Sequence, residues 1–244
     1  MTERATPKAF EARGPMLNVN EIFYSVQGES TYAGLPCVFV RLRGCHLRCH
    51  YCDTEYAFHE GERWSIERVL HEVEAIAGGK ADLVEVTGGE PLLQRNVHPL
   101  MTALCDAGKT VLLETSGACD VSPCDPRVVR VMDLKTPGSG ESSRNLWSNI
   151  EHLNERDEVK FVLTGREDYD WMRGVLDKHE LSKRVGAVLV SAVNTVTPGP
   201  GSEVAGCAGM SITDLAEWVI ADRLPVRVQT QLHKLIWDPT ARGV

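Results

Sequence analysis

Three cysteines lie within eight residues of one another and could bind a metal ion or an iron-sulfur cluster. Cys45, Cys49 and Cys52 follow the pattern C-x3-C-x2-C, directly after an apolar run that is typical of a buried strand. Three thiolates leave one position open, whether they bind a tetrahedral zinc ion or the irons of a cubane cluster. A structural zinc ion is the simpler interpretation and would need a histidine as fourth ligand, taken from His46, His50 and His59.

A glycine-rich turn, Thr87-Gly88-Gly89-Glu90-Pro91, ends the next predicted strand. By itself, such a turn is an ordinary exit from a strand. The carboxyl ends of parallel strands meet at one edge of a sheet, where α/β folds place their active sites. The combination of this turn with the cysteine loop therefore favours a catalytic site over a structural zinc site.

The elements that must position these residues alternate between strands and helices. Apolar runs and alternating patterns predict strands over residues 21–27, 37–42, 83–87, 110–115, 128–134, 158–163, 187–190 and 226–232. The helical period predicts helices over residues 66–77, 93–107, 144–154, 169–178 and 212–222, the first of them capped by Ser65. Strands that alternate with helices pair in parallel through right-handed crossovers. We therefore expect an α/β fold, a partial (β/α) barrel with a mostly parallel sheet.

The composition is that of an acidic chain with an ordinary globular content of apolar residues. Among 244 residues, 26 Lys and Arg stand against 34 Asp and Glu, which is a formal charge of −8. Because the sequence has no Lys/Arg block, we expect a small-molecule partner, and neither nucleic acid nor an anionic membrane surface. No apolar run approaches the length of about 20 residues that a membrane-spanning helix needs.

The chain divides into a short leader and one domain. Residues 1–15 are polar and aperiodic, so we expect a flexible leader there and a single domain over residues 16–244. Residues 195–209 are rich in proline and glycine and are expected to form the longest loop. Residues 1–15 also lack the apolar segment of a secretion signal, so we expect a cytoplasmic location, where eight cysteines are more typical of ligands and free thiols than of disulfides. Five of them receive no role: Cys37, Cys105, Cys119, Cys124 and Cys207.

The cysteine loop and the glycine turn together resemble the radical S-adenosylmethionine superfamily. In that superfamily a C-x3-C-x2-C loop holds a 4Fe-4S cluster, and a GGE-type turn binds the amino group of the methionine moiety. The resemblance implies a reduced barrel of the radical S-adenosylmethionine type. It also implies that S-adenosylmethionine chelates the open iron and is cleaved by an electron from the cluster to a 5'-deoxyadenosyl radical.

Four further segments narrow the resemblance to one family. The segments EIFYSVQGES (21–30), FVRLRGC (39–45), CHYCDT (49–54) and QLHKLIW (231–237) resemble the 7-carboxy-7-deazaguanine synthase family of queuosine biosynthesis. The resemblance implies a homodimeric radical lyase that uses Mg2+ and an external electron donor such as a flavodoxin. Its reaction would convert 6-carboxy-5,6,7,8-tetrahydropterin to 7-carboxy-7-deazaguanine with loss of ammonia. The alternatives are a glycyl-radical-enzyme activase and a non-catalytic iron-sulfur or zinc module.

The resemblance assigns substrate, magnesium and cofactor contacts by position. Arg41 would bind the substrate carboxylate, a role that suits its planar group with two parallel donors. Thr54 would bind Mg2+ through its hydroxyl. The other substrate contacts would be Val26, Gln27, Gly28 and Thr87. The contacts to S-adenosylmethionine would be Tyr51, Cys52, Asp53, Gly89, Asp133, Leu134, Lys135, Ser191, Ala192, Val193 and Asn194.

The last predicted strand leaves a question open. Arg227, Gln229, Gln231 and His233 alternate on one of its faces. That face is either exposed to solvent or part of the site. The sequence does not assign a catalytic acid or base.

Overall fold

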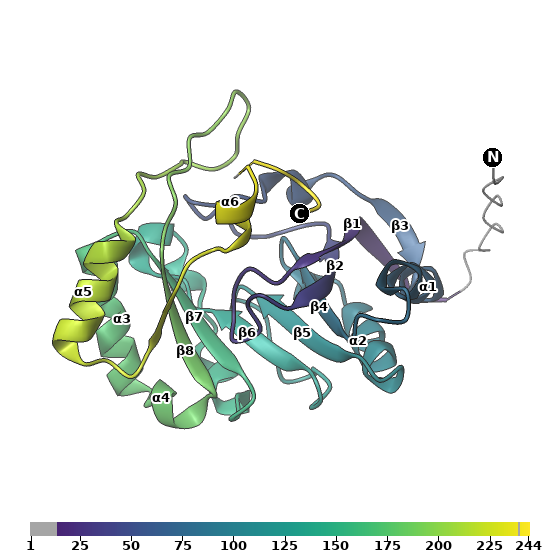
Figure 1. Ribbon diagram of the computed structural model, residues 1–244, viewed down its shortest axis with the longest axis horizontal. Helices are drawn as coiled ribbons and strands as arrows, with labels where there is room; N and C mark the ends of the chain where they lie inside the picture. Colours follow the sequence, from purple (N-terminus) through teal and green to yellow (C-terminus); the bar gives the residue numbers. More distant parts are fainter. Residues whose placement is uncertain (1–13, 239) are drawn as a thin grey trace.

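One nine-stranded sheet organises the molecule. The computed structural model describes residues 14–238 and 240–244, so residues 1–13 of the expected leader lie outside the described residues. The strand order is β3-β1-β2-β4-β5-β6-β7-β8-β9 (Figure 1). The strands are β1 (Met16–Val26), β2 (Pro36–Leu42), β3 (Glu62–Ser65), β4 (Leu83–Gly88), β5 (Thr110–Thr115), β6 (Val129–Asp133), β7 (Glu158–Leu163), β8 (Ala187–Ala192) and β9 (Arg227–Gln229).

The sheet is mostly parallel, as the alternation of strands and helices predicts. From β2 to β9, each strand pairs in parallel with its neighbour in the sheet, whereas β1 pairs antiparallel with both β2 and β3. The strand order is linear and does not close on itself. The expected partial barrel is therefore confirmed, with an antiparallel extension at one edge.

Two of the predicted helices are confirmed with the bounds that their caps indicate. The Oγ of Ser65 accepts a hydrogen bond from the Arg68 amide at 3.2 Å, and Gly78 ends α1 in the left-handed region at φ 57°. Ser211 caps α5 in the same way. The helices are α1 (Ile66–Ala77), α2 (Val97–Asp106), α3 (Arg166–Lys178), α4 (Leu181–Arg184), α5 (Ile212–Asp222) and α6 (His233–Ile236).

The helix expected over 144–154 is wrong. The segment instead holds two short 3-10 helices, η4 (Ser142–Arg144) and η5 (Trp147–His152). Two asparagines explain this, because their amides bind the backbone of distant loops: Asn145 donates to the Lys135 carbonyl at 2.9 Å and Asn149 to the Cys119 carbonyl at 2.7 Å. Such side-chain bonds compete with a regular helix.

Other bounds also differ from the expectation: β1 begins at Met16 and not at Glu21, and α3 begins at Arg166 and not at Tyr169. The helix expected over 93–107 begins only at Val97, because residues Pro91–Leu93 form the 3-10 helix η2 and Asn96 precedes α2. The strand expected over 226–232 is limited to β9, and the Leu232 amide then donates to the Gly28 carbonyl at 2.9 Å as the chain turns into α6. Gln231 and His233 therefore do not lie on a strand face.

The strands place apolar and polar side chains on opposite faces of the sheet, since successive residues alternate. On β4, Val84 and Val86 are fully buried in the core with α1 and α2, whereas Glu85 and Thr87 face the interior cavity. On β7, Phe161 belongs to the core with α3 and α5 and Lys160 faces the cavity. The helices thus cover one face of the sheet, and the other face is left for a site.

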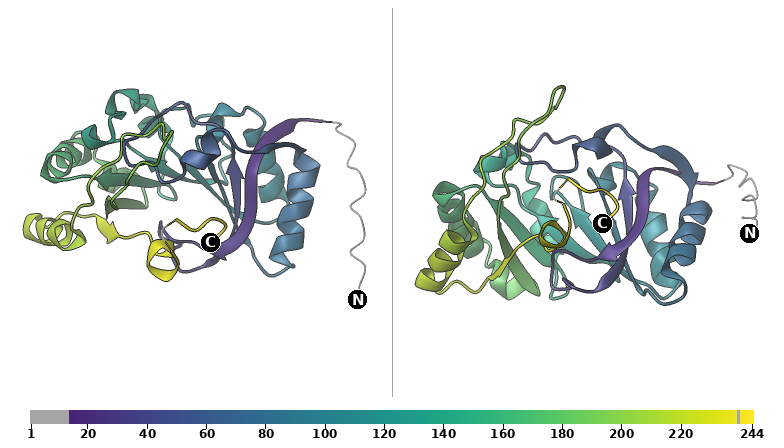
Figure 2. Two further views of the ribbon diagram at one scale, coloured as in Figure 1. Left: turned by 90° about the horizontal axis from the view of Figure 1, so that it is seen from above. Right: turned by 45° about the horizontal axis from the view of Figure 1, so that its top comes forward.

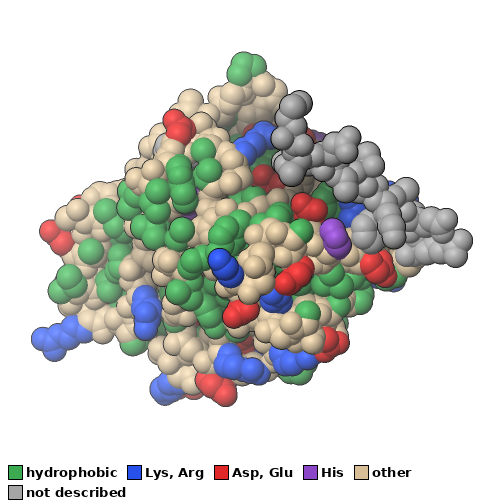
Figure 3. All heavy atoms as spheres, turned by 45° about the vertical axis from the view of Figure 1, so that its right-hand side comes forward, with side chains coloured by type: hydrophobic (Ala, Val, Ile, Leu, Met, Phe, Trp, Pro, Cys, Tyr) green, Lys and Arg blue, Asp and Glu red, His purple; other side chains and the backbone are tan. Residues whose placement is uncertain are grey.

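The chain after β9 returns to the middle of the molecule. In Figures 1 and 2, the last segment (yellow) lies between the part with α1 and α2 and the part with α3 and α5. On the face drawn in Figure 3, acidic and basic side chains are interspersed among apolar ones. None of the helices in the described part of the chain has the length and apolar character needed to cross a membrane.

Candidate active site

A cavity of about 770 Å³ opens at the carboxyl ends of the parallel strands. Its walls come from distant parts of the chain, including the cysteine loop, residues 194–202 and residues 240–244. The cavity is lined by almost every site residue that the sequence predicts: Val26, Gln27, Gly28, Arg41, Cys49, Tyr51, Cys52, Asp53, Thr54, Thr87, Gly89, Asp133, Lys135, Ser191, Ala192, Val193 and Asn194. Cys45 and Leu134 are outside this lining.

The cysteine loop and the glycine turn are packed backbone to backbone. A Cβ atom on Gly89 would lie 2.4 Å from the Gly44 carbonyl oxygen and 2.7 Å from the Cβ of Cys45. The Glu90 amide donates to the same Gly44 carbonyl at 2.8 Å. Only glycine fits at position 89, so the turn and the loop are held together as one unit.

Glu90 anchors the turn and does not line the cavity. Its carboxylate is fully buried and accepts hydrogen bonds from the amides of Leu92 at 2.9 Å and Ser116 at 2.7 Å. The hydroxyl of Thr115 also donates to it. A buried carboxylate with this many donors is a structural support for the turn.

The three thiols fit a cluster better than a single ion. They share an apolar environment with Leu47 and Val193. In the described residues, no three His, Cys, Asp or Glu side chains are close enough to hold one metal ion. The thiolates of a cubane cluster bind separate irons and stand farther apart than ligands to one ion. The zinc interpretation is therefore not favoured.

Burial also affects the protonation of these thiols. It raises the pKa of Cys52 to about 12, with the Asp53 carboxylate adding to the effect. It raises the pKa of Cys45 and Cys49 as well, and Lys135 opposes the shift in both. Because a metal binds the thiolate form, binding of a metal by these cysteines would release their protons.

Two polar groups on the strand ends have capacity for a ligand. Asp133 Oδ1 and Ser191 Oγ are buried and have no hydrogen-bond partner among the described residues, and both side chains line the cavity. The other oxygen of Asp133 accepts from Lys135 Nζ at 2.8 Å. Unpaired buried polar groups are costly, so Asp133 Oδ1 has the capacity to accept a hydrogen bond from a ligand, and Ser191 Oγ the capacity to donate or accept one. Leu134 instead belongs to the core.

Arg41 and Thr87 are neighbours across the β2 and β4 pair. Arg41 is not an unpaired charge, because its Nε donates to Glu21 Oε1 at 2.8 Å. The Tyr56 hydroxyl donates to that same oxygen at 2.8 Å. Burial raises the pKa of Tyr56 to about 12, with the adjacent Arg41 opposing the shift, so the phenol remains a donor.

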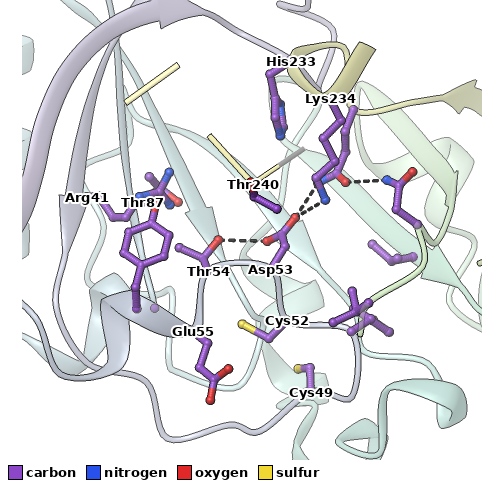
Figure 4. A pocket seen from close by; sticks show the side chains of 18 of the residues that line it. Arg41, Cys49, Cys52, Asp53, Thr54, Glu55, Thr87, His233, Lys234 and Thr240 are labelled. Atoms are coloured by element: carbon purple, nitrogen blue, oxygen red, sulfur yellow. Dashed lines mark hydrogen bonds and ion pairs between the residues drawn. The ribbon is translucent and has the colours of Figure 1, made fainter. Parts of the chain in front are cut away.

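Thr54 and Asp53 lie between Arg41 and the cysteines (Figure 4). The Thr54 hydroxyl donates to Asp53 Oδ1 at 2.9 Å, and Lys234 forms an ion pair with the same carboxylate. Although burial acts to raise the pKa of Asp53, the Lys234 ammonium and the hydrogen bonds lower it well below its usual range. The ionised carboxylate and the hydroxyl together are oxygen donors of the kind that a hard cation prefers.

A buried charge network on the cavity floor was not predicted from the sequence. Lys160 Nζ forms ion pairs with Glu29 at 2.6 Å and with Glu114, and it lies 4.0 Å from Asp133. Nearby, Gln27 donates to Glu85. The available signal is a charged residue in the middle of an apolar strand, as in LVEVTG and EVKFVL, where an unpaired charge would be costly.

The carboxyl groups of this network have opposite pKa shifts. Burial, with the charge of Glu114 nearby, raises the pKa of Glu85 well above its usual value. Burial acts on Glu114 in the same direction, but the Lys160 ammonium outweighs it and lowers the pKa of Glu114 to about 2. The network therefore favours the protonated form of Glu85 beside an ionised Glu114.

Comparisons with known proteins agree with this arrangement. Residues 39–133 match the family model described as the Radical SAM superfamily. The chain is 44% identical over 231 residues to a 7-carboxy-7-deazaguanine synthase from Chlorobaculum tepidum, covering 93% of this chain and 97% of that protein. It is 41% identical to the Koribacter versatilis protein of the same name, covering 93% and 100%. The crystal structure of QueE from Escherichia coli superposes with a TM-score of 0.67 at 25% identity, over 89% of this chain and 95% of that chain.

The fold, the cysteine loop and the glycine turn define a radical S-adenosylmethionine enzyme. Membership in that superfamily implies a 4Fe-4S cluster and S-adenosylmethionine as cofactors. Within the superfamily, the chain belongs to the 7-carboxy-7-deazaguanine synthase family.

Proposed function

We propose that the chain converts 6-carboxy-5,6,7,8-tetrahydropterin to 7-carboxy-7-deazaguanine with loss of ammonia, in 7-deazapurine biosynthesis. The supporting observation is that one cavity joins the cysteine loop and the glycine turn to Gln27, Arg41 and Thr87. The bound cluster and S-adenosylmethionine supply a 5'-deoxyadenosyl radical. The residues of the chain bind and orient the pterin and exclude water from it.

The substrate contacts fall on the wall formed by β1, β2 and β4. Arg41 binds the carboxylate, since its planar group offers two parallel donors. Gln27 and Thr87 offer hydrogen bonds to the pterin ring. Val26 and Gly28 approach the ring through the backbone, and a Cβ atom on Gly28 would lie 2.4 Å from His233 Nδ1, so a larger residue there would displace the His233 side chain.

The cofactor contacts fall on the opposite wall. Cys45, Cys49 and Cys52 hold three irons of the cluster, and Gly89 receives the amino group of the methionine moiety. The remaining contacts to S-adenosylmethionine come from the cysteine loop and from the ends of β6 and β8: Tyr51, Asp53, Asp133, Lys135, Ser191, Ala192, Val193, Asn194 and, through its backbone, Leu134.

We also infer the metal ion, the electron donor, the oligomeric state and the location of the protein. Thr54 binds Mg2+ through its hydroxyl, with substrate oxygens and water completing the shell. A flavodoxin or a similar protein delivers the electron. Residues 16–244 act as one domain, the chain forms a homodimer, and it is located in the cytoplasm.

An anaerobic assay with the reconstituted protein tests this function. We expect 5'-deoxyadenosine and 7-carboxy-7-deazaguanine to form together when the carboxypterin, reductant and Mg2+ are present. A glycyl-radical activase would cleave S-adenosylmethionine without any dependence on the pterin. An iron-sulfur carrier or zinc module would yield no 5'-deoxyadenosine. Either of these results contradicts the proposal.

A further inference from the structure

A series of contacts runs from Arg41 through Glu21 and Tyr56 to Arg242 and Glu60. Glu21 Oε1 accepts two hydrogen bonds at 2.8 Å, one from Arg41 Nε and one from the Tyr56 hydroxyl. The ring of Tyr56 has guanidinium groups near it from both Arg41, at 5.9 Å, and Arg242, at 3.8 Å from the ring centroid. Arg242 in turn donates from Nη1 to Glu60 at 2.8 Å.

These contacts determine which edge of the Arg41 guanidinium is available. Glu21 binds its Nε, and the terminal nitrogens have no hydrogen bond to any residue in the described part of the chain. A guanidinium group is planar and rigid, so a partner that holds one edge also orients the other. The edge that remains is the one that can bind a carboxylate through two parallel hydrogen bonds.

The same side chains form a wall between two cavities. Tyr56, Glu60 and Arg242 line the large cavity and also a neighbouring pocket of about 430 Å³, and Glu21 lines only this second pocket. Residues 240–244 line only the large cavity, apart from Arg242. Arg242 therefore attaches this last segment to the wall that supports Arg41.

We propose that Glu21 and Tyr56 are positioning residues for Arg41, and that Arg242 couples their arrangement to the position of residues 240–244 over the cavity. The substrate carboxylate then meets a guanidinium group that is already oriented. This inference rests on the role proposed above for Arg41.

The first measurement is steady-state kinetics of a variant that lacks the phenol oxygen. Tyr56→Phe keeps the ring but removes its hydrogen bond to Glu21, and we expect KM for the carboxypterin to rise roughly tenfold, in keeping with a hydrogen bond to a charged group. Arg242→Ala should shift KM in the same direction. Arg242→Lys should raise KM less than Arg242→Ala does but should not keep the wild-type value, because an ammonium group can pair with Glu60 but cannot stack on the Tyr56 ring as a planar group does.

Two readouts separate positioning from a general loss of structure. The melting temperature, and the slow formation of 5'-deoxyadenosine without pterin, should stay at wild-type values in each variant. Tyr24→Phe, on the same strand as Glu21 but exposed and outside the cavity lining, is the matched control and should leave KM unchanged. Arg184→Ala, at an exposed position on α4, serves the same purpose for Arg242.

A double variant completes the test. Because Tyr56 acts through Arg41, Tyr56→Phe should add no further rise in KM once Arg41→Ala is present. If the two effects multiply, Tyr56 acts independently and the inference is wrong. If Arg41→Ala raises KM but Tyr56→Phe and Arg242→Ala do not, Arg41 keeps its role and the positioning is wrong. If Arg41→Ala itself leaves KM unchanged, the role proposed for Arg41 is the part that fails.

Discussion

Two regions of the cavity hold their polar groups by different means. The cofactor wall, which we define as Cys45–Asp53 with Gly88 and Gly89, is built from close backbone contacts. Cβ atoms on Gly88 and Gly89 would lie 2.4 Å from the carbonyl oxygens of Leu42 and Gly44. The acidic wall, defined as Glu29, Glu85, Glu114 and Lys160, is built from buried and partly buried side chains, in which Lys160 forms ion pairs with Glu29 and Glu114.

The structures of the two walls depend on different interactions. Backbone packing in the cofactor wall depends on glycine at two positions and on the strands beneath it, and it does not depend on the thiols. The charges of the acidic wall depend on one another, because a buried charge without its partner is costly. Substitutions in the two walls should therefore affect different properties of the protein.

The largest effect is expected from the cysteines of the cofactor wall. Cys49→Ala should abolish the brown chromophore and the cleavage of S-adenosylmethionine, while the free energy of unfolding of the apoprotein changes by only about 1 kcal/mol. Iron analysis and denaturant unfolding measure the two properties. Cys105→Ala, at a half-buried cysteine of α2, is the control and should keep its iron. Full turnover by Cys49→Ala would contradict the assignment.

Lys160→Met should do the reverse. It leaves buried carboxylates without their cation, so we expect the unfolding free energy to fall by about 3 to 5 kcal/mol while the cluster is still bound. Denaturant unfolding at pH 7 measures the loss. The loss should shrink at lower pH, where protonation neutralises Glu29 and Glu114. Adding Glu29→Gln and Glu114→Gln should recover much of the stability. If Lys160→Met alone is as stable as wild type, the network does not contribute to stability.

Thr54→Ala tests the residue that directly follows the cofactor wall in the chain. If the hydroxyl binds Mg2+, we expect the Mg2+ concentration for half-maximal product formation to rise by about tenfold, as losses at metal sites typically do. Cleavage of S-adenosylmethionine should be largely unchanged, and Thr54→Ser should respond to Mg2+ almost as wild type does. The measurement is a Mg2+ titration of product formation. If Thr54→Ala keeps the wild-type Mg2+ dependence, Thr54 does not bind the ion.

The smallest effect is expected from Glu85→Gln. Because burial raises the pKa of Glu85, the folded protein keeps a proton that the unfolded chain releases, and stability is lost as pH rises above the ordinary carboxyl pKa. The amide copies the protonated acid, so the variant should be more stable than wild type at pH 8, by on the order of 1 kcal/mol, and similar at pH 5.

Unfolding measured at both pH values tests this difference. Glu114 does not interfere, since its lowered pKa of about 2 makes its contribution disappear only well below pH 5. A constant difference between variant and wild type across this range would mean that Glu85 is ionised in the folded protein.

The local sequence was sufficient for the features whose causes are local. Ser65 and Gly78 define α1, because a cap and a left-handed terminus act within one turn. The C-x3-C-x2-C loop and the Gly88-Gly89 turn are each a short continuous segment, so both could be recognised in the sequence from their residues and their resemblance to a family. The parallel order of the strands follows from their alternation with helices.

The tertiary structure decided what depends on partners far apart in the chain. Asn145 and Asn149 bind loops on other elements, and this replaces a predicted helix with 3-10 turns. Lys160 on β7 meets Glu114 on β5 and Glu29 in the loop after β1 only because the folded sheet brings these distant segments together. The contacts of Arg242 span nearly the whole length of the domain. Such contacts leave no periodic pattern in the sequence, because their energy comes from neutralising charge in a cavity that exists only after the sheet has formed.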